Sequence, residues 1–193
     1  MIIRKLYEFE NAHIVRLCGS KRCRTSIHGH SYRCEILLSS NFLDEAGMVY
    51  DFGYMKLGIR ELIDSFDHAT TIYARDDAGY IADLKKHSAR WVQIPLNPSA
   101  EQFCRIFFVL IDRLLSLTQM QNGEREVKLH SVIVHETATG YAQCFRDDAY
   151  NAQMGEIALD EIEFSPAVRE EWRQPELWQK LLRGEKIIYP KDC

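Results

Sequence analysis

The sequence predicts an α+β fold, and two periodic patterns carry this prediction. Apolar and polar residues alternate near both ends of segment 1–146, which is the period of half-buried strands. Between those ends, apolar residues recur every three or four positions, which is the period of amphipathic helices. Two strands, two helices and two further strands in this order are typical of antiparallel hairpins that pack against helices.

Two strands are expected near the start of the chain, over residues 2–13 and 28–40. Residues two apart on a strand point the same way, so each strand presents one apolar face to a core. The turn formers of residues 41–49 then connect the strands to the rest of the fold. The first strand has Ile3, Tyr7, Phe9 and His13 on one face. The second has His28, His30, Tyr32, Cys34, Ile36 and Leu38 in phase.

Two helices are expected in the middle of the chain. The first covers residues 52–66, with Phe52, Met55, Ile59, Leu62, Ile63 and Phe66 on its apolar face. The second begins after Ser99, a suitable N-cap with Gln102 three residues later. Its buried stripe is Phe103, Phe107, Leu110, Ile111 and Leu114. Residues 73–97 are irregular, with only a weak helical pattern around residues 78–88.

The last two strands of the α+β unit are expected over residues 126–136 and 141–145. The tail that follows differs in character, because Pro166 and Pro175 are typical of helix starts and Gly184 of a helix stop.

We therefore divide the chain into an α+β domain over residues 1–146 and a helical C-terminal extension over residues 147–193.

Composition and charge exclude several classes of protein. Of 193 residues, 46% are hydrophobic and 27% charged, which is the balance of a soluble globular protein and excludes a disordered or fibrous one. The net charge of -4 argues against a broad basic face for nucleic acid. No apolar run approaches the ~20 residues of a membrane span, and the start lacks a secretory signal. We expect a cytoplasmic protein without a nucleic-acid or membrane partner.

The six cysteines are spread along the chain, at Cys18, Cys23, Cys34, Cys104, Cys144 and Cys193. In a reducing compartment they are expected to be thiols or metal ligands rather than disulfides.

The motif His28-Gly29-His30 is the strongest sign of chemistry in the chain. On a strand both imidazoles point to one side, so both can bind one metal ion. His13 ends the preceding strand and could supply a third nitrogen. Three histidines with an open fourth position are typical of a catalytic zinc site. The same pair of histidines could also arise by chance on a surface strand.

Cys23 lies in a loop with three cations, and nearby cations favour the thiolate that acts as a nucleophile, base or metal ligand. Two alternatives remain open for it. Cys23 could be an ordinary thiol, or it could join Cys18, His28 and His30 in a closed structural Cys2His2 zinc site. The structural site would not need His13, whereas the catalytic site would. A metal-binding role for His13 therefore distinguishes the two kinds of zinc site.

Four other residues could take part in chemistry. Asp67 precedes His68, and a carboxylate beside an imidazole can orient it, although the same pair is common at helix ends. Glu101 lies in the first turn of a helix, where the dipole stabilises negative charge. Glu136 ends an apolar strand, where it could bind a planar pair of N–H donors or simply be solvated.

Taken together, these residues resemble the 6-pyruvoyl-tetrahydropterin synthase / 6-carboxy-tetrahydropterin synthase family. The resemblance covers about residues 3–146, and its closest counterpart is the bacterial carboxy-type enzyme of the queuosine pathway. The matching pieces, in the family's order, are Phe9-x-x-Ala12-His13, Cys23, His28-Gly29-His30-Ser31-Tyr32, Gly47-Met48-Val49-x-Asp51-Phe52, Asp67-His68, Pro98-Ser99-Ala100-Glu101 and Glu136-Thr137.

For the fold, the resemblance implies the tunnelling fold, an antiparallel four-stranded sheet with two helices on one face. In the family, three subunits close their sheets into an oligomeric β-barrel, and two trimers often stack. The resemblance therefore implies a homotrimer or homohexamer.

For the site, the resemblance implies that His13, His28 and His30 ligate Zn²⁺ and that Cys23 is the catalytic base.

It further implies that Asp67 and His68 activate that cysteine from a neighbouring subunit. Glu101 and Glu136 would anchor the ring of a pterin substrate.

For the activity, the resemblance implies a zinc-dependent lyase that converts 7,8-dihydroneopterin triphosphate to 6-carboxy-5,6,7,8-tetrahydropterin, acetaldehyde and triphosphate. The alternative product is 6-pyruvoyl-tetrahydropterin, and a second alternative is a non-catalytic protein with the structural Cys2His2 zinc. The chain departs from the family in a Cys23-to-His28 spacing between the two types, in a longer segment 73–97 and in the extension.

Overall fold

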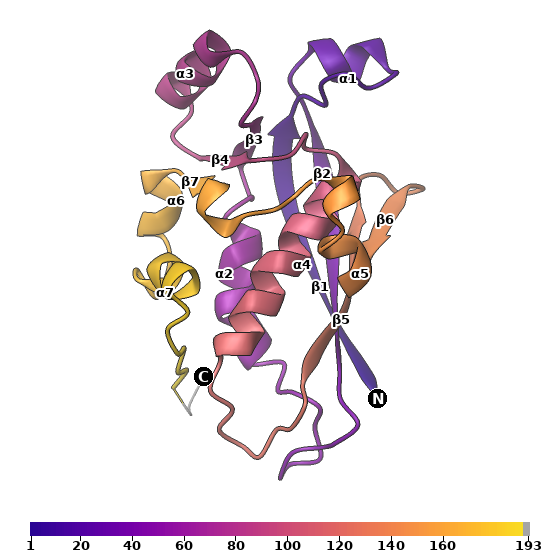
Figure 1. Cartoon of the computed structure of the whole chain (residues 1–193), viewed down its shortest axis with the longest axis vertical. Coiled ribbons are helices and arrows are strands. Elements are labelled where there is room, and N and C mark those ends of the chain that lie inside the picture. The colour runs from indigo at the N-terminus through magenta and orange to yellow at the C-terminus, as the bar shows by residue number, and fades with distance from the viewer. Residues whose placement is uncertain (191–193) are drawn as a thin grey trace.

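The computed structural model describes residues 1–190, and Figure 1 shows its elements. The strands are β1 (Ile2–His13), β2 (His28–Ser39), β3 (Ala69–Tyr73), β4 (Trp91–Ile94), β5 (Lys128–His135), β6 (Tyr141–Cys144) and β7 (Glu163–Phe164). The α-helices are α1 (Lys21–Thr25), α2 (Gly58–Asp64), α3 (Ala78–His87), α4 (Ala100–Leu117), α5 (Arg146–Ala149), α6 (Pro166–Glu170) and α7 (Leu177–Arg183). Single 3-10 turns lie at Tyr54–Lys56, Ala152–Met154 and Leu159–Glu161.

The α+β class is confirmed, but the prediction of an antiparallel four-stranded sheet is wrong. The strands of residues 1–190 form one seven-stranded sheet in the order β6-β5-β2-β1-β3-β4-β7. The antiparallel unit β6-β5-β2-β1 was expected, whereas β3 pairs parallel to β1 and β4 parallel to β3. The sheet has two open edges, so this chain does not by itself form a closed barrel.

Two helices cover one face of the sheet, as predicted. In Figure 1, α2 and α4 run side by side, and α2 packs on β1 while α4 packs on β5 and β6. The core between these layers is rich in aromatic rings. Phe9 of β1 stacks on Tyr32 of β2 at 4.9 Å between ring centroids, and Phe107 of α4 meets Phe9 edge-on at 5.5 Å. The alternating strands thus turn their apolar side toward the helices.

The start of α4 is set by a local N-cap, whereas the start of α2 is set by packing against a distant part of the chain. Ser99 caps α4, because its hydroxyl oxygen accepts the amide of Gln102 at 3.4 Å. The helix expected over residues 52–66 is shorter, since Leu57 leaves helical geometry and α2 begins at Gly58. A Cβ at Gly58 would lie 2.2 Å from the hydroxyl of Tyr189, so the glycine makes room for the C-terminal extension.

The segment 73–97 is more regular than expected: α3 confirms the weak helical pattern around residues 78–88, whereas β4 was not expected. Asp77 caps α3 through the amide of Tyr80 at 2.9 Å. The strands β3 and β4 have five and four residues, which is too short for a clear alternation. Their parallel pairing joins segments that are far apart along the chain.

The C-terminal extension contains the two expected helices. Ser165 caps α6, and α7 ends at Gly184, which has a φ of +73° in the left-handed region that favours glycine. The strand β7 was not expected, and it pairs antiparallel with β4. Phe164 and Trp178 lie in the same hydrophobic core as α4. The division of the chain at residue 146 stays a sequence-based prediction.

Two observations bear on the environment of the chain. Within residues 1–190, no helix has both the length and the apolar character needed to cross a bilayer. Five cysteines of this part of the chain are free thiols, namely Cys18, Cys23, Cys34, Cys104 and Cys144. Cys193 lies outside the described residues.

Candidate active site

Three histidines meet where the first hairpin opens. His13 is the last residue of β1 and lies directly opposite His28, the first residue of β2. His30 follows two positions later on the same face as His28. One ring nitrogen from each of the three lies within 4.8 Å of the other two. The strand register therefore forms a group that could hold one metal ion.

The hydrogen bonds of these rings leave the correct nitrogen free for a metal. The Nδ1 atom of His13 lies 2.6 Å from the carbonyl oxygen of Pro98, and that of His28 lies 3.0 Å from the carbonyl oxygen of Ser26. A carbonyl oxygen only accepts, so both Nδ1 atoms carry the proton and both Nε2 atoms keep a lone pair. Bonds of this kind orient the histidine ligands of metals in proteins.

Burial also keeps His13 in the form that binds a metal. Its side chain is fully buried and stacks on Phe103, with 6.1 Å between ring centroids. Burial, the largest cause, lowers the pKa of His13 from 6.5 to about 4, so the ring is neutral at physiological pH. A neutral imidazole is the metal-binding form.

Three of the five expected catalytic and binding residues line one pocket beside the histidines. Cys23 from α1, Glu101 from the first turn of α4 and Glu136 just after β5 border the same cavity of about 380 Å³. His28 and His30 form its wall toward the hairpin. Four segments of the sequence thus meet in one place.

A closed Cys2His2 site does not match this arrangement. Cys18 and Cys23 both border the pocket, yet neither belongs to the metal-binding group found among residues 1–190. His13 belongs to that group, and it was the residue that separated the two interpretations. The geometry therefore favours three histidines over two cysteines and two histidines.

Tyr32 is a fully buried residue behind the pocket, and sequence analysis missed its contact with the pocket residue Glu136. Its hydroxyl donates to Glu136 Oε1 at 3.3 Å and lies 3.4 Å from both ring nitrogens of His13. Burial and then the charge of Glu136 raise the pKa of Tyr32, so the hydroxyl keeps its proton and holds the carboxylate. Its phase with His28 and His30 on β2 was the available signal.

The structure does not bring Asp67 and His68 to this pocket. They lie in the turn between α2 and β3, with Asp67 Oδ2 2.9 Å from His68 Nδ1. His68 borders another cavity, formed on the outer face of β1 and β2 by residues that include Glu10 and Ser31. Glu10 and Ser31 alternate with the histidine ligands along the strands, so His68 lies at the opposite face of the sheet, beside a cavity that His30 also borders and Cys23 does not.

Comparison with protein families and sequences gives a consistent result. The family model described as 6-pyruvoyl tetrahydropterin synthase matches residues 2–147. A Helicobacter pylori protein named 6-carboxy-5,6,7,8-tetrahydropterin synthase is 35% identical over 190 residues, which cover 98% of this chain and 95% of that protein. A protein of the same name from Aquifex aeolicus is 30% identical over 121 residues, which cover 61% of this chain and 73% of that protein. The Helicobacter match includes almost the whole C-terminal extension.

Solved structures have the same fold at lower sequence identity. The Caenorhabditis elegans 6-pyruvoyl tetrahydropterin synthase matches with a TM-score of 0.53 and 19% identity, over 75% of this chain and 94% of that one. The Plasmodium vivax 6-pyruvoyl tetrahydropterin synthase matches with a TM-score of 0.56 and 20% identity, over 76% and 98%. The shared part corresponds to about three quarters of this chain.

Proposed function

This chain belongs to the 6-pyruvoyl tetrahydropterin synthase family, and we propose that it is a zinc-dependent lyase acting on 7,8-dihydroneopterin triphosphate. The proposed products are 6-carboxy-5,6,7,8-tetrahydropterin, acetaldehyde and triphosphate, and the atoms balance when one water is consumed. The choice of the carboxy product is supported by the name of the relative that matches along almost the whole chain. The observation that carries the lyase is the pocket in which Cys23, Glu101 and Glu136 border the histidine group.

His13, His28 and His30 would hold the zinc ion. The fit is supported by their three converging nitrogens and by the carbonyl oxygens that fix the proton on Nδ1 of two of them. Three histidines leave a fourth position open for substrate oxygen. When bound, zinc would supply Lewis-acid polarisation of the hydroxyl groups on the substrate side chain.

Glu101 and Glu136 would bind the pterin ring, because a carboxylate accepts two parallel N–H bonds from an aminopyrimidine. Tyr32 supports this role by donating a hydrogen bond to Glu136, which orients that carboxylate at the pocket wall. The two glutamates approach the cavity from α4 and from the end of β5.

Cys23 would move protons to and from the substrate side chain as triphosphate leaves. A thiolate can take this role when it borders the bound substrate, and Cys23 lies in the wall of the same cavity as His28. The hydrogen bond from the amide of Val15 to the carbonyl oxygen of Cys23 at 3.0 Å holds α1 to the chain after β1.

Asp67 and His68 would complete the site of a neighbouring subunit. Within one chain they face the opposite side of the sheet from Cys23, so a shared site needs a second copy. The open edges of the sheet also favour assembly, because an unpaired edge must be covered. We propose a homotrimer or homohexamer whose barrel is closed by several chains.

We further propose that the reaction takes place in the cytoplasm and serves queuosine biosynthesis. The free thiols of the described residues are consistent with a reducing compartment.

The experiment that tests the function is incubation of the zinc-loaded protein with 7,8-dihydroneopterin triphosphate, with products identified by mass spectrometry. Acetaldehyde together with the carboxypterin is the expected result. A pyruvoyl-pterin would assign the other activity of the family. An unchanged substrate in the presence of bound zinc would contradict both.

A further inference from the structure

The turn that carries Asp67 and His68 has a backbone that its surroundings must maintain. His68 has a φ of +50°, in the left-handed region that non-glycine residues rarely adopt. Such a conformation persists only where the surrounding structure fixes it. On one side β1 does so, since the His68 amide donates to the carbonyl oxygen of Glu10 at 2.7 Å and the Glu10 amide donates to Asp67 Oδ1 at 2.7 Å.

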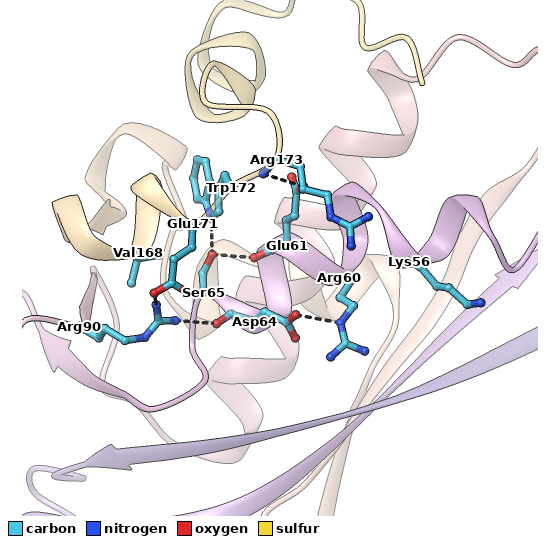
Figure 2. Close-up of a pocket in the computed structure, with 10 residues that line it drawn as sticks. All are labelled: Lys56, Arg60, Glu61, Asp64, Ser65, Arg90, Val168, Glu171, Trp172 and Arg173. Carbon is cyan, nitrogen blue, oxygen red and sulfur yellow. Dashed lines mark hydrogen bonds and ion pairs between the residues drawn. The ribbon is translucent and has the colours of Figure 1, made fainter. Parts of the chain in front are cut away.

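Arg90 holds the other side of the same turn. Its Nε donates to the main-chain oxygen of Asp67 at 3.0 Å, and its Nη2 donates to the main-chain oxygen of Asp64 at 3.0 Å. Its Nη1 lies 2.6 Å from Oε1 of Glu171 in the C-terminal extension (Figure 2). A guanidinium carries its donors in a rigid plane, so it fixes the two main-chain oxygens relative to one another, while the ion pair with Glu171 holds the guanidinium itself.

The main chain of Arg90 is itself firmly placed. Its carbonyl oxygen accepts the amide of Thr70 at 3.1 Å and the hydroxyl of Ser88 at 2.9 Å. The next residue, Trp91, donates its amide to the buried hydroxyl of Ser165 in the extension at 3.3 Å. The arginine therefore reaches the turn from the position directly before β4, a strand that is paired on both sides.

The extension also holds the end of α2 directly. The indole nitrogen of Trp172 donates to the Ser65 hydroxyl at 2.9 Å, and the Arg173 amide donates to Glu61 Oε1 at 3.1 Å. Figure 2 shows both contacts above the helix end that Arg90 approaches from the left. The turn thus begins from a helix end fixed by contacts with the extension.

We propose that Arg90 is a positioning residue that sets the place and orientation of His68 through the main chain of Asp67, and that Glu171 holds Arg90 in that role. The inference rests on the proposed function, since it takes His68 as the catalytic partner of a neighbouring cysteine. It gives a role to two segments that the proposed reaction does not otherwise use, because segment 73–97 supplies the arginine and the extension supplies the glutamate.

The first test is steady-state kinetics of Arg90→Ala with the zinc-loaded oligomer. We expect kcat to fall about 10- to 100-fold, since a misplacement of about 1 Å at a reacting group can cost about 100-fold in rate. KM should stay within about twofold of the wild-type value, because the pocket that binds the pterin is unchanged. Arg90→Lys should recover part of the loss, as a lysine keeps one donor.

Arg60→Ala is the matched control. Arg60 borders the pocket of Figure 2 together with Arg90 and Glu171, away from the histidine pocket. It pairs with the Asp64 carboxylate at 2.8 Å, yet no hydrogen bond joins it to the main chain of the turn among the described contacts. Its removal takes one cation from the same helix end, so kcat should remain within about twofold of wild type.

Two further readouts separate positioning from a general structural role. Millimolar, non-denaturing guanidinium should restore turnover to Arg90→Ala, because the ion can occupy the vacated place beside Glu171. In a histidine-labelled sample, the NMR signals of the His68 ring should shift in Arg90→Ala and stay unchanged in Arg60→Ala.

The outcomes distinguish the inference from the proposed function. If His68→Ala loses turnover while Arg90→Ala matches Arg60→Ala in kcat and His68 signals, the inference is wrong and the function stands. The inference is also overturned if kcat, KM and thermal midpoint change together without guanidinium rescue. If His68→Ala itself turns over normally, the assigned role of His68 fails and the inference fails with it.

Should Arg90→Ala not fold, Glu171→Ala answers the same question. Glu171 is exposed, so its removal leaves the core intact. It should lower kcat more than Arg60→Ala does, and an equal kcat would overturn the inference.

Discussion

The histidine pocket and the Asp67–His68 turn hold their functional side chains in different ways. In the pocket, the three histidines are neighbours in a single hairpin, and the pairing of His13 with His28 places them. At the turn, the supports come from distant parts of the chain, for example from Trp172 to Ser65 across 107 positions. Functional residues that one hairpin brings together can be predicted from short sequence motifs. Functional residues that distant contacts hold in place cannot be predicted in this way.

The comparison also predicts how each region fails. Loss of one histidine should abolish the site without disturbing the hairpin, because the strands pair through their backbones along twelve positions. Loss of a support at the turn should leave all candidate ligands in place and alter only the orientation of His68.

The largest effect is expected for His13→Ala. A metal site of three histidines loses its geometry when one ligand is removed, so zinc affinity should fall by more than the 10- to 100-fold typical of a second-sphere change, that is, by more than about 100-fold. Zinc content after dialysis, measured by elemental analysis, should be as low as in His28→Ala. His130→Ala is the control, since His130 packs on Phe145 outside the group. Retained zinc in His13→Ala together with its loss in Cys18→Ala would restore the Cys2His2 interpretation.

The next effect is expected for Cys23→Ala. Zinc content and fold should persist, while turnover should fall by about 10²–10⁴, the usual contribution of a general base. Single-turnover assays with dihydroneopterin triphosphate would measure the loss. Cys18→Ala is the control: Cys18 borders the same pocket, and its substitution should retain turnover. Normal turnover in Cys23→Ala would remove this thiol from the mechanism.

A mixture of two inactive variants tests whether Cys23 and His68 of one active site come from different subunits. Cys23→Ala and His68→Ala should regain activity after subunit exchange, because some mixed sites join an intact cysteine to an intact histidine. For random pairing about one quarter of such sites are intact, and a symmetric oligomer has one such site at each of its equivalent interfaces. Native mass spectrometry would establish that exchange occurred. Persistent inactivity of demonstrated mixed oligomers would place the whole site within one chain.

The smallest effect is expected for Ser165→Ala, at the junction of the extension and the sheet. Its buried hydroxyl accepts the amides of Val168 and Trp91, each at 3.3 Å. Removing a helix cap typically costs about 1 kcal/mol, so the free energy of unfolding should fall by about 1–2 kcal/mol. Denaturant titration would measure it against Ser116→Ala, an exposed helical serine. Equal stability of the two variants would show that this junction contributes little to the free energy of unfolding.

The parts of the fold that the sequence predicted are long and strongly periodic. β1 and β2 have twelve residues each and α4 has eighteen, so their patterns repeat several times. The missed strands β3, β4 and β7 have five, four and two residues, and they pair with segments outside their own neighbourhood. A pattern that repeats once or twice carries little information about such pairing.

In the candidate site, too, local spacing predicted some features, whereas others depended on long-range contacts. The spacing of His28 and His30 was sufficient to indicate a shared metal, because strand geometry fixes the direction of both side chains. The proton positions on His13 and His28 depended on the carbonyl oxygens of Pro98 and Ser26, which no motif identifies. Tyr32 was counted as a core residue, and its contact with a carboxylate 104 positions later became visible only in the fold.

By itself, then, the sequence determined the α+β class, the hairpin that brings the histidines together and the resemblance to the pterin enzymes. Local periodicity and short spacing control each of these, so they survive without knowledge of long-range contacts. Only the tertiary structure decided that the sheet has seven strands, that His68 faces away from Cys23 and that Arg90 joins its turn to Glu171. These features depend on contacts between segments tens of residues apart, whose pairing is fixed by burial and hydrogen bonding of the whole chain.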